Sequence, residues 1–515
     1  MLLIEANDAS FFDLAEEFGG PKPLRRCLSL MRQQGVVTVV VEELPADEVE
    51  ANDQAYFESR GFVLSRARHR LSFTKTATDL VAQGEVISDD YLGYCLVNSD
   101  QVRYASADPD GALFHSINYI PEAVLPIPSN PDRLLTCGTG FRCEFLGQEL
   151  SVDAALFSQQ PAHIGCCAHA SLLMVTAQLQ AEAKLSHVDI NQKAGLEFLP
   201  ELACRRGLNT VEIRDVLHSL GLKTTIFSYA GPDEEDETIR EQYEQLMDLL
   251  PPQQVLYYAI ESGFPALLGF QAGNEGHVIP ILGHVFNGDT WLAEAERDYF
   301  DLADSDAGDY AEGRTRYLRS SAWTSHFVAM DDNYGPYYDL PSYVWQHGWS
   351  FVIVVTPEDC TFDAPLVEAI AAFDLFETYH PAMSETVGAP DSAWGKRLVQ
   401  HLEDKRVVLR TVWVDRDRYL EQLGAGIAEE SVDTWAEASA VLADLPKGVW
   451  LVEVSIPELY TTNRMKLADI FVTRNGEELI TLGIRVPGYL AMRQNGDLTI
   501  YGLPGIEHYY PLFTR

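Results

Sequence analysis

The chain has 515 residues, of which 46% are hydrophobic, and a formal net charge of −40 at pH 7. This length exceeds what one hydrophobic core supports, and the composition is that of a globular protein, so two or three folded domains are expected. The strongly acidic balance argues against nucleic acid and anionic membranes as partners, because a phosphate backbone needs a basic surface.

The ends of the chain and its cysteines indicate the compartment. The first residues, MLLIEANDAS, lack the basic segment of a secretory signal, and no apolar run approaches the ~20 residues of a membrane helix. Among the eight cysteines, Cys137 and Cys143 lack the second pair that a metal site of this type needs. We therefore expect free thiols, a cytoplasmic protein, no metal and no cofactor. The oligomeric state is left open.

Residues 1–150 predict an N-terminal accessory α/β domain. FFDLAEEF and PLRRCLSLMRQQ are helical patterns, and VVTVVVEEL is a β-branched run that favours a buried strand. A short helix is expected in AYFESRGF, and strands dominate residues 86–150. The first part resembles the end of an acetyltransferase domain, but it lacks a glycine-rich loop for acyl-CoA. Whether residues 1–150 act as a propeptide is left open.

The segment QQPAHIGCCAHASLLMV contains the candidate nucleophile. Two adjacent cysteines, Cys166 and Cys167, follow a glycine and open into a run of small and apolar residues. They are expected at or just inside a helix N-terminus, where the helix dipole stabilises a thiolate. A thiolate is the nucleophile of cysteine hydrolases. The alternatives are two buried structural cysteines, or a metal site with His163 that would need a fourth ligand and better spacing.

Two later strands are predicted to supply a histidine and a carboxylate. His277 opens the strand HVIPILGHVF, and SHFVAM predicts a strand that ends in Asp331 and Asp332. Neighbours in a strand point to opposite faces, so only one aspartate is expected to face the histidine. The alternatives are that His277 is a core residue, and that the aspartates with Asn333 form a simple turn or a cation site.

A hairpin and an insertion are predicted between these two strands. Asn287 and Gly288 predict a tight turn into a strand over TWLAEA. Residues 290–325 are expected to form an insertion that acts as a lid or a substrate-recognition element. The other nearby histidines, His169 and His284, are expected to be structural or exposed rather than catalytic.

The order of these residues resembles that of papain-like cysteine peptidases, and most of all their bacteriocin-processing (double-glycine leader) peptidase-like branch. CAHASLLM is similar to the nucleophile pattern C-G-P-A-S-L-x-M, with Ser171 four residues after Cys167. GHVIPILG is similar to the histidine pattern of that branch. DNYG resembles the sequence around the orienting asparagine of papain, with Asp332 in the asparagine position. The resemblance covers the middle of the chain and neither flank.

The resemblance implies a role for each of four residues. Cys167 would attack as a thiolate, and Gln160 with the helix N-terminus would stabilise the oxyanion. His277 would act as acid and base, and Asp332 would orient it.

Two alternates remain within this set. The glutamine of the family lies six residues before the nucleophile, and Gln160 lies six before Cys166 but seven before Cys167. The helix-side match favours Cys167, so Cys166 is kept as the alternate nucleophile. Asp331 is kept as the alternate orienting residue.

Together these patterns predict an α+β protein with a papain-like core over residues 151–357. In that core a helix carrying the cysteine packs on an antiparallel sheet carrying the histidine and the aspartate. Accessory α/β domains flank it, and the C-terminal one, residues 358–515, has an α+β pattern with hairpin turns at Asn475 and Asn495. The expected function is hydrolysis of peptide or isopeptide bonds in a protein or peptide substrate. The alternatives are an acyltransferase or transglutaminase-like use of the same triad, and a non-catalytic papain-like binding module.

Overall fold

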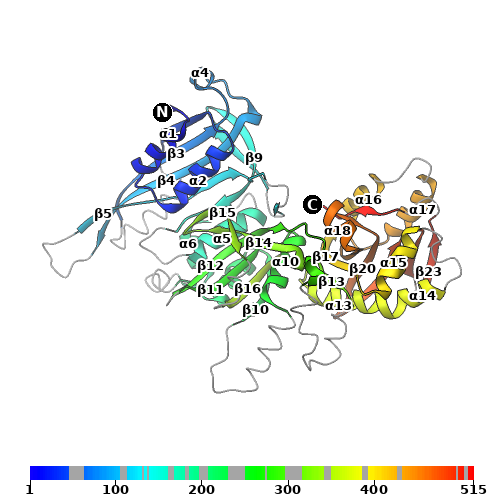
Figure 1. Cartoon of the computed structure of the whole chain (residues 1–515). Helices are drawn as coiled ribbons and strands as arrows, with labels where there is room; N and C mark the ends of the chain where they lie inside the picture. Colours follow the sequence, from blue (N-terminus) through cyan, green and yellow to red (C-terminus); the bar gives the residue numbers. More distant parts are fainter. Residues whose placement is uncertain are drawn as a thin grey trace. The chain divides into compact units, whose positions relative to one another are not determined.

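The computed structural model has an α+β architecture built mainly on antiparallel sheets, as the sequence predicts. Figure 1 shows the order of its helices and strands. The structure describes the whole chain except residues 46–62, 105–112, 130–132, 136–138, 161–166, 180–184, 197–206, 230–249, 273–274, 296–315, 342–348, 386–392, 426–431, 495–496, 504–507 and 515.

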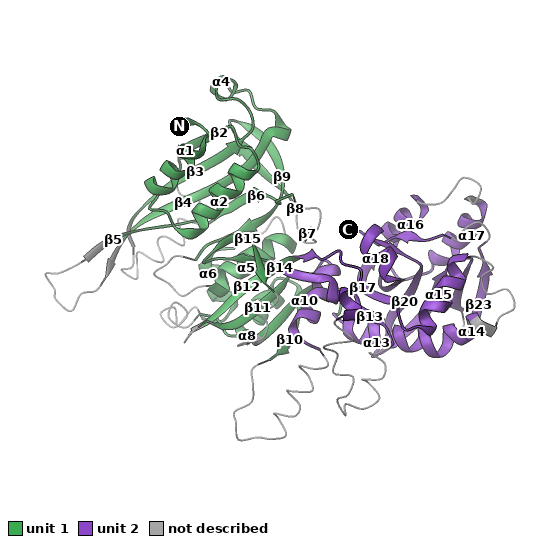
Figure 2. Cartoon of the chain, viewed as in Figure 1, with its two compact units in different colours: residues 1–230, 264–283, 327–361 green, residues 231–263, 284–326, 362–515 purple. Residues whose placement is uncertain are grey.

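The chain divides into two compact units (Figure 2). Unit 1 contains residues 1–230, 264–283 and 327–361, and unit 2 contains residues 231–263, 284–326 and 362–515. The sequence-based division into domains 1–150, 151–357 and 358–515 stays a prediction.

The first sheet of unit 1 has eight strands in the order β1-β2-β3-β4-β6-β9-β8, with β5 beside β4. Helices α1 and α2 lie along it (Figure 1). Helix α1 begins at a reciprocal capping box between Asn7 and Ser10. Helix α2 buries Leu24, Cys27, Leu28 and Met31, the spacing of one helical face. The elements are β1 (Leu2–Glu5), α1 (Asp8–Glu17), α2 (Lys22–Gln33), β2 (Thr38–Glu43), β3 (Val63–Thr74), α4 (Thr78–Ala82), η1 (Ser88–Asp90), β4 (Tyr91–Tyr104), β5 (Leu113–Tyr119), β6 (Ala123–Pro126), β8 (Thr139–Phe145) and β9 (Gln148–Phe157).

The two helices and the buried strand that the sequence predicts before residue 45 are confirmed. The short helix expected in AYFESRGF lies outside the described residues.

The second sheet of unit 1 has the order β10-β16-β11-β12-β14-β15, with β7 beside β12. One hydrophobic core joins helices α5, α6 and α8 to strands β10, β11, β12 and β16. Helix α8 begins at a cap in which the side chain of Asn209 accepts from the backbone of Glu212. The elements are β7 (Arg133–Leu135), α5 (Cys167–Leu179), α6 (His187–Lys193), α8 (Thr210–Ser219), β10 (Leu222–Ser228), β11 (Ala266–Ala272), β12 (Glu275–Phe286), β14 (Thr324–Asp331), β15 (Gly335–Pro341) and β16 (Trp349–Pro357).

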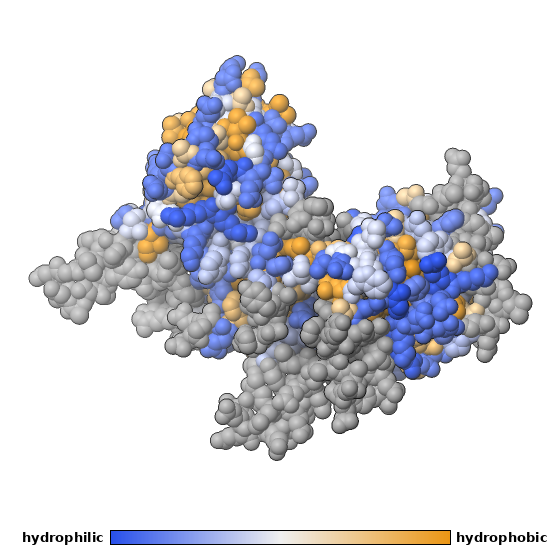
Figure 3. Space-filling model, viewed as in Figure 1, coloured by the Kyte–Doolittle hydropathy of each residue, from blue (hydrophilic) through white to orange (hydrophobic). Residues whose placement is uncertain are grey.

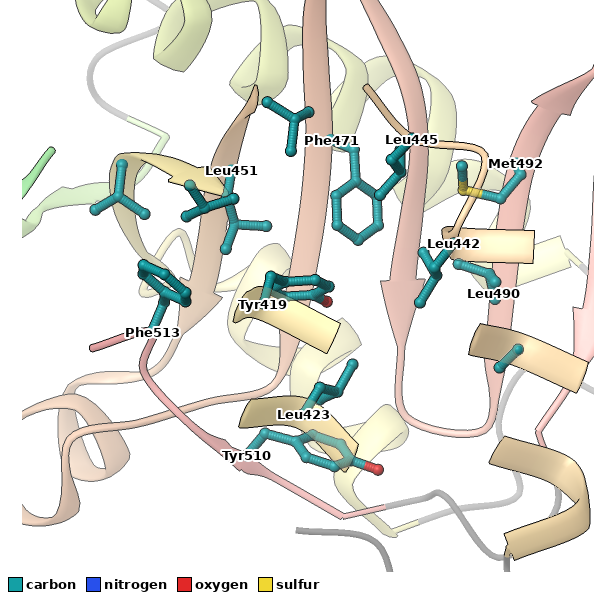
Figure 4. Packing of buried hydrophobic residues seen from close by; sticks show 14 of the residues in the cluster. Tyr419, Leu423, Leu442, Leu445, Leu451, Phe471, Leu490, Met492, Tyr510 and Phe513 are labelled. Atoms are coloured by element: carbon teal, nitrogen blue, oxygen red, sulfur yellow. The ribbon is translucent and has the colours of Figure 1, made fainter. Parts of the chain in front are cut away.

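The sheet of unit 2 has the order β13-β17-β18-β20-β21-β22-β23. Strand β13 is parallel to β17, and the pairs from β17 onward are antiparallel. Figure 4 shows its core, in which Tyr419, Leu451 and Phe471 pack with the C-terminal Phe513. The elements are α10 (Pro252–Glu261), β13 (Leu318–Arg319), η2 (Ser320–Trp323), α13 (Ala364–Asp374), η4 (Leu375–Tyr379), α14 (His380–Glu385), α15 (Ala393–Glu403), β17 (Val408–Asp415), α16 (Arg416–Ala425), α17 (Val432–Leu442), β18 (Gly448–Ser455), α18 (Pro457–Asn463), β19 (Met465–Lys466), β20 (Ala468–Asn475), β21 (Glu478–Val486), β22 (Tyr489–Gln494), β23 (Asp497–Gly502) and β24 (Tyr510–Pro511).

The segment after β12 differs from the prediction. The expected strand over TWLAEA is wrong, because residues 292–295 are helical. The side chain of Asn287 accepts from the backbone of Asp289 at 3.0 Å, and the Asp289 carboxylate accepts from the backbone of Trp291 at 2.9 Å. These side-chain bonds begin a helical turn instead of a hairpin. Of the predicted insertion, residues 296–315 lie outside the described part of the chain.

Unit 2 also contains a chain of buried charges. Glu453 contacts the guanidinium of Arg410 and lies 2.6 Å from the ammonium of Lys466, and all three side chains are at most 5% exposed. The Glu453 carboxylate also accepts from the backbone of Phe513 at 2.7 Å. Because buried charges need partners, this carboxylate holds the two cations and the C-terminal segment in place.

The surface contains both hydrophobic and hydrophilic residues. On the face drawn in Figure 3, hydrophobic residues are interspersed among hydrophilic ones. Among the described residues, no helix combines the length and the apolar character that a bilayer crossing requires.

Candidate functional site

Cys167 is the first residue of helix α5, and its side chain is half-buried. The first turn of a helix has backbone N–H groups without intrahelical partners, and these favour negative charge nearby. The position agrees with the expectation that the double cysteine opens a helix. Cys166 and His163 lie outside the described residues, so the preference for Cys167 over Cys166 still rests on the sequence pattern.

One hydrogen bond fixes helix α5 against strand β12. The hydroxyl of Ser171, one helical turn after Cys167, donates to the backbone oxygen of Val278 at 2.9 Å. Val278 directly follows His277, and both bonded residues are buried. The serine in the nucleophile pattern therefore ties the cysteine helix to the histidine strand.

His277 lies near the start of β12 with its ring held on several sides. Its ring meets the Phe270 ring edge to face, with centroids 5.4 Å apart, and the two residues are paired across β11 and β12. Its Nε2 lies 3.4 Å from Oδ1 of Asp332 and 3.6 Å from Oδ1 of Asp331. The side-chain amide of Asn333 lies 3.3 Å from the same nitrogen. Only 11% of the His277 side chain is exposed.

Both aspartates face the histidine, so the expectation that only one of them would do so is wrong. Strand β14 ends at Asp331, and Asp332 lies in the following turn, where strand alternation no longer applies. Oδ1 of Asp331 accepts from the backbone of Asn333 at 2.8 Å and of Tyr334 at 3.3 Å, which closes the turn.

Asp332 differs from Asp331 in its hydrogen bonding. It is 1% exposed, and neither carboxylate oxygen has a hydrogen bond of good geometry within the described residues. The close contact with Nε2 of His277 is therefore its main electrostatic support. Asp331 both closes the turn and hydrogen-bonds the histidine, whereas Asp332 has the histidine as its main partner.

The charges at this site favour an imidazolium. Burial alone lowers the pKa of His277, but hydrogen bonds with Asp331 and Cys167 and the charges of both aspartates outweigh it and raise this pKa to about 10. Burial raises the pKa of Asp332 to about 7, with the positive charge of His277 opposing and the charge of Asp331 adding to the rise. A full ion pair between His277 and Asp332 is therefore expected above about pH 7.

The ring of His277 has two kinds of neighbour. Nε2 faces the two aspartates, and the Cys167 thiol is one of the groups that raise the pKa of this histidine. An imidazolium beside a cysteine favours the thiolate. Because Nε2 of an imidazolium donates, a 180° rotation of the Asn333 amide would present its oxygen as the acceptor.

The two glutamines before the cysteines also differ. Gln159 forms two hydrogen bonds with the backbone of Ile120. Its side-chain oxygen accepts from the Ile120 N–H at 3.0 Å, and its backbone N–H donates to the Ile120 oxygen at 2.7 Å. Gln160 is half-buried and lies three residues after β9. Residues 161–166, which connect it to Cys167, lie outside the described part. The assignment of Gln160 as oxyanion donor therefore still rests on the sequence pattern.

The two other histidines are structural, as expected. His169 is buried, and its Nε2 lies 2.9 Å from the side-chain oxygen of Asn191. His284, in unit 2, is buried with its Nε2 2.7 Å from the Glu261 carboxylate.

Three of the site residues could also hold a divalent cation. One ligand atom from each of His277, Asp331 and Asp332 lies within 4.8 Å of the others. An imidazole with two carboxylates is a donor set that zinc accepts. However, Oδ1 of Asp331 already accepts two backbone N–H groups, and an imidazolium has no lone pair for a metal.

Comparison of the chain with protein-family models, with curated proteins and with solved structures finds no match. Unit 1 brings together a half-buried thiol, an imidazole and a carboxylate. It also includes Asn333 and Phe270, which sequence reasoning did not assign to the site. The only available signal for Phe270 was the antiparallel pairing of two predicted strands.

Proposed function

We propose that this chain is a cysteine hydrolase with a papain-like core, closest to the bacteriocin-processing branch, acting on peptide or isopeptide bonds. One observation carries the proposal: the Cys167 thiol, at the start of α5, is among the groups that raise the pKa of His277, and Nε2 of that histidine lies 3.4 Å from Asp332. The motif resemblance around Cys167 and His277 supports the same assignment. A cytoplasmic location belongs to the proposal as well and rests on the cysteine usage of the sequence.

The first half of the reaction forms an acyl-enzyme. The Cys167 thiolate attacks the amide carbonyl carbon, and the carbonyl oxygen becomes an oxyanion near the N–H groups that open α5. Gln160 is the proposed side-chain donor to that oxyanion. The imidazolium of His277 then gives its Nδ1 proton to the leaving amine as the carbon–nitrogen bond breaks.

The second half of the reaction releases the acid. Neutral His277 removes a proton from water, and the resulting hydroxide attacks the thioester carbonyl. The carbon–sulfur bond breaks, the Cys167 thiolate is restored, and the imidazolium forms again. Asp332 holds the ring orientation throughout and stabilises the imidazolium.

The same triad permits two other outcomes. If an amine replaces water in the second step, the protein is an acyltransferase or a transglutaminase-like enzyme. If the thiol is unreactive, the papain-like core is a binding module for its flanking domains. Incubation with a mixed peptide library, with and without a primary amine, distinguishes hydrolysis from amide formation by the mass of the products.

A metal site at His277, Asp331 and Asp332 is the competing hypothesis, favoured by the closeness of their ligand atoms. The two hypotheses predict opposite results with zinc. A metal site should bind Zn²⁺ in equilibrium dialysis and lose it in Asp332→Asn, whether or not Cys167 is present. A triad should bind no stoichiometric zinc after Cys167→Ala, and its thiol should react with iodoacetamide at a rate that depends on His277.

A further inference from the structure

The turn that contains Asp332 and Asn333 is held by residues far away in the sequence. Arg26, on helix α2, donates from Nε to the backbone oxygen of Pro336 at 2.5 Å. The same guanidinium also donates to the backbone oxygen of Tyr337. These bonds join helix α2 to the start of β15, directly after the turn.

Tyr337, which directly follows Pro336 in this strand, is held by the first sheet. Its hydroxyl donates to the backbone oxygen of Leu125 at 2.8 Å and accepts from the backbone N–H of Ala155 at 2.9 Å. Leu125 and Ala155 belong to β6 and β9 of the first sheet and are paired with each other. Tyr337 has a φ of +54° and is 1% exposed. A non-glycine residue keeps this backbone conformation only where its surroundings fix it.

Gly335 shows how closely α2 approaches the turn. Its φ is +110°, and a Cβ there would lie 2.9 Å from Cδ of Arg26 and 3.2 Å from Cα of Pro23. A side chain at this position would push α2 and the turn apart. Helix α2 and the first sheet therefore contact the segment that immediately follows Asp332 and Asn333.

We propose that helix α2 and the first sheet form part of the proposed active site. Arg26 and Tyr337 would be positioning residues for the turn over residues 331–334, called the acidic turn below. This inference rests on the proposed function. It predicts that residues 1–157 are needed for the reactive state of Cys167 and do not act as a removable propeptide. Arg26 and Tyr337 would act through the turn, because the hydrogen bonds described above join them to backbone atoms and not to His277.

The reason is geometric. Asp332 contacts Nε2 of His277 at 3.4 Å and has few other supports, so its position follows that of the turn backbone. A displacement of about 1 Å at a reacting group can reduce a rate by on the order of a hundredfold. Loss of the Arg26 bonds or of the Tyr337 bonds removes contacts that fix the backbone directly after the turn.

The test compares three variants of the full chain with the wild type. Arg26→Ala removes both bonds to β15, and Tyr337→Phe removes only a hydroxyl. Arg25→Ala is the matched control, because Arg25 is exposed on the same helix. Two quantities are measured: the pKa of His277 by NMR titration of its ring C–H signals, and the alkylation rate of Cys167 by iodoacetamide.

We expect Arg26→Ala and Tyr337→Phe to lower the pKa of His277 and to slow alkylation on the order of tenfold. Arg25→Ala should leave both quantities unchanged, and Arg26→Lys should restore part of the loss. If Arg26→Ala fails to fold, Tyr337→Phe still tests the inference, since it removes a single oxygen atom.

The inference is overturned if folded Arg26→Ala and Tyr337→Phe proteins keep the wild-type titration and alkylation rate. Failure of the proposed function is a different result. In that case the wild-type alkylation rate is already independent of His277, whereas the NMR titration still reports whether Arg26 and Tyr337 position the acidic turn.

Discussion

The hydroxyl of Ser171 donates to the backbone oxygen of Val278 over 2.9 Å. Ser171 lies one helical turn after Cys167, and Val278 is the residue after His277. A buried hydrogen bond therefore joins the helix of the proposed nucleophile to the strand of the proposed base, beside the hydrophobic core that they share. Cys167 and His277 are far apart in the sequence, so only the fold brings them together. The bond between Ser171 and Val278 helps to hold their two elements side by side.

Removal of that bond should affect both stability and reactivity. In Ser171→Ala, loss of the bond and of a partner for the Val278 oxygen should lower the free energy of unfolding by about 1–3 kcal/mol. The alkylation rate of Cys167 should also fall. Thr176→Ala is the control, because the Thr176 hydroxyl bonds only within α5, to the backbone of Leu172 and Leu173. Equal alkylation rates in the two variants would argue against this role for Ser171.

The two aspartates should be separable by substitution. Asp332→Asn removes the charge and should lower the pKa of His277 and the alkylation rate of Cys167. Asp331→Asn keeps an oxygen that can accept from the two backbone N–H groups and from the imidazolium, so it should have a smaller effect. Asp331→Ala opens the turn and should also lower stability by about 1 kcal/mol. The assignment of Asp332 as orienting residue is wrong if Asp331→Asn slows alkylation more than Asp332→Asn does.

The histidine should give stability a defined pH dependence. Its pKa is raised from 6.5 to about 10, so the stabilisation that it contributes is complete below pH 6.5 and is lost as the pH rises through about 10. We expect the stability advantage of wild type over His277→Gln, measured by urea unfolding, to shrink over that range. The slope should not exceed about 1.4 kcal/mol per pH unit. An advantage that grows with pH would contradict the assignment.

The buried Asp332 should act in a lower range of pH. Its pKa is raised from 3.8 to about 7, so the folded state binds this proton more tightly and loses stability as the pH rises between those values. Asp332→Asn should therefore gain stability relative to wild type over this interval. Urea unfolding of both proteins across the interval measures the difference, which should be flat if Asp332 is ionised normally.

The buried charges of unit 2 give a prediction that is independent of catalysis. Glu453→Gln removes one buried anion from Arg410 and Lys466, which keep Glu261 and Asp469 as partners, and should lower the stability of unit 2 by roughly 1–3 kcal/mol. Glu377→Gln is the matched control, because Glu377 pairs with Arg316 at the surface. That change should cost at most about 1 kcal/mol. Comparable losses in the two variants would show that burial is unimportant for this carboxylate.

Local patterns were sufficient to predict much of the secondary structure. The tight turn at Asn475 depends on residues within a few positions, and it is present in the structure. The start of the cysteine helix follows from the same kind of short-range signal. The prediction failed after Asn287, where the side chains of Asn287 and Asp289 begin a helical turn in a segment whose sequence is also typical of a hairpin.

Long-range relationships were not accessible in this way. Arg26 and Pro336 are 310 residues apart, and no periodicity or motif connects them. The approach of both aspartates to His277 depends on where β14 ends, and the alternating pattern does not fix a strand end to one residue. The residues of the acidic turn could therefore be predicted from the sequence, whereas the distant residues that hold this turn could not.

The central claim is that His277 activates Cys167. The direct measurement is the rate of alkylation of Cys167 by iodoacetamide at neutral pH, followed by mass spectrometry in the wild type and in His277→Ala. Cys166→Ala serves as the background in both proteins, so that only one thiol of the pair is counted. The account predicts rapid labelling of Cys167 that falls at least about tenfold without the imidazole. Equal rates in the two proteins, at the level of an ordinary exposed thiol, would contradict it.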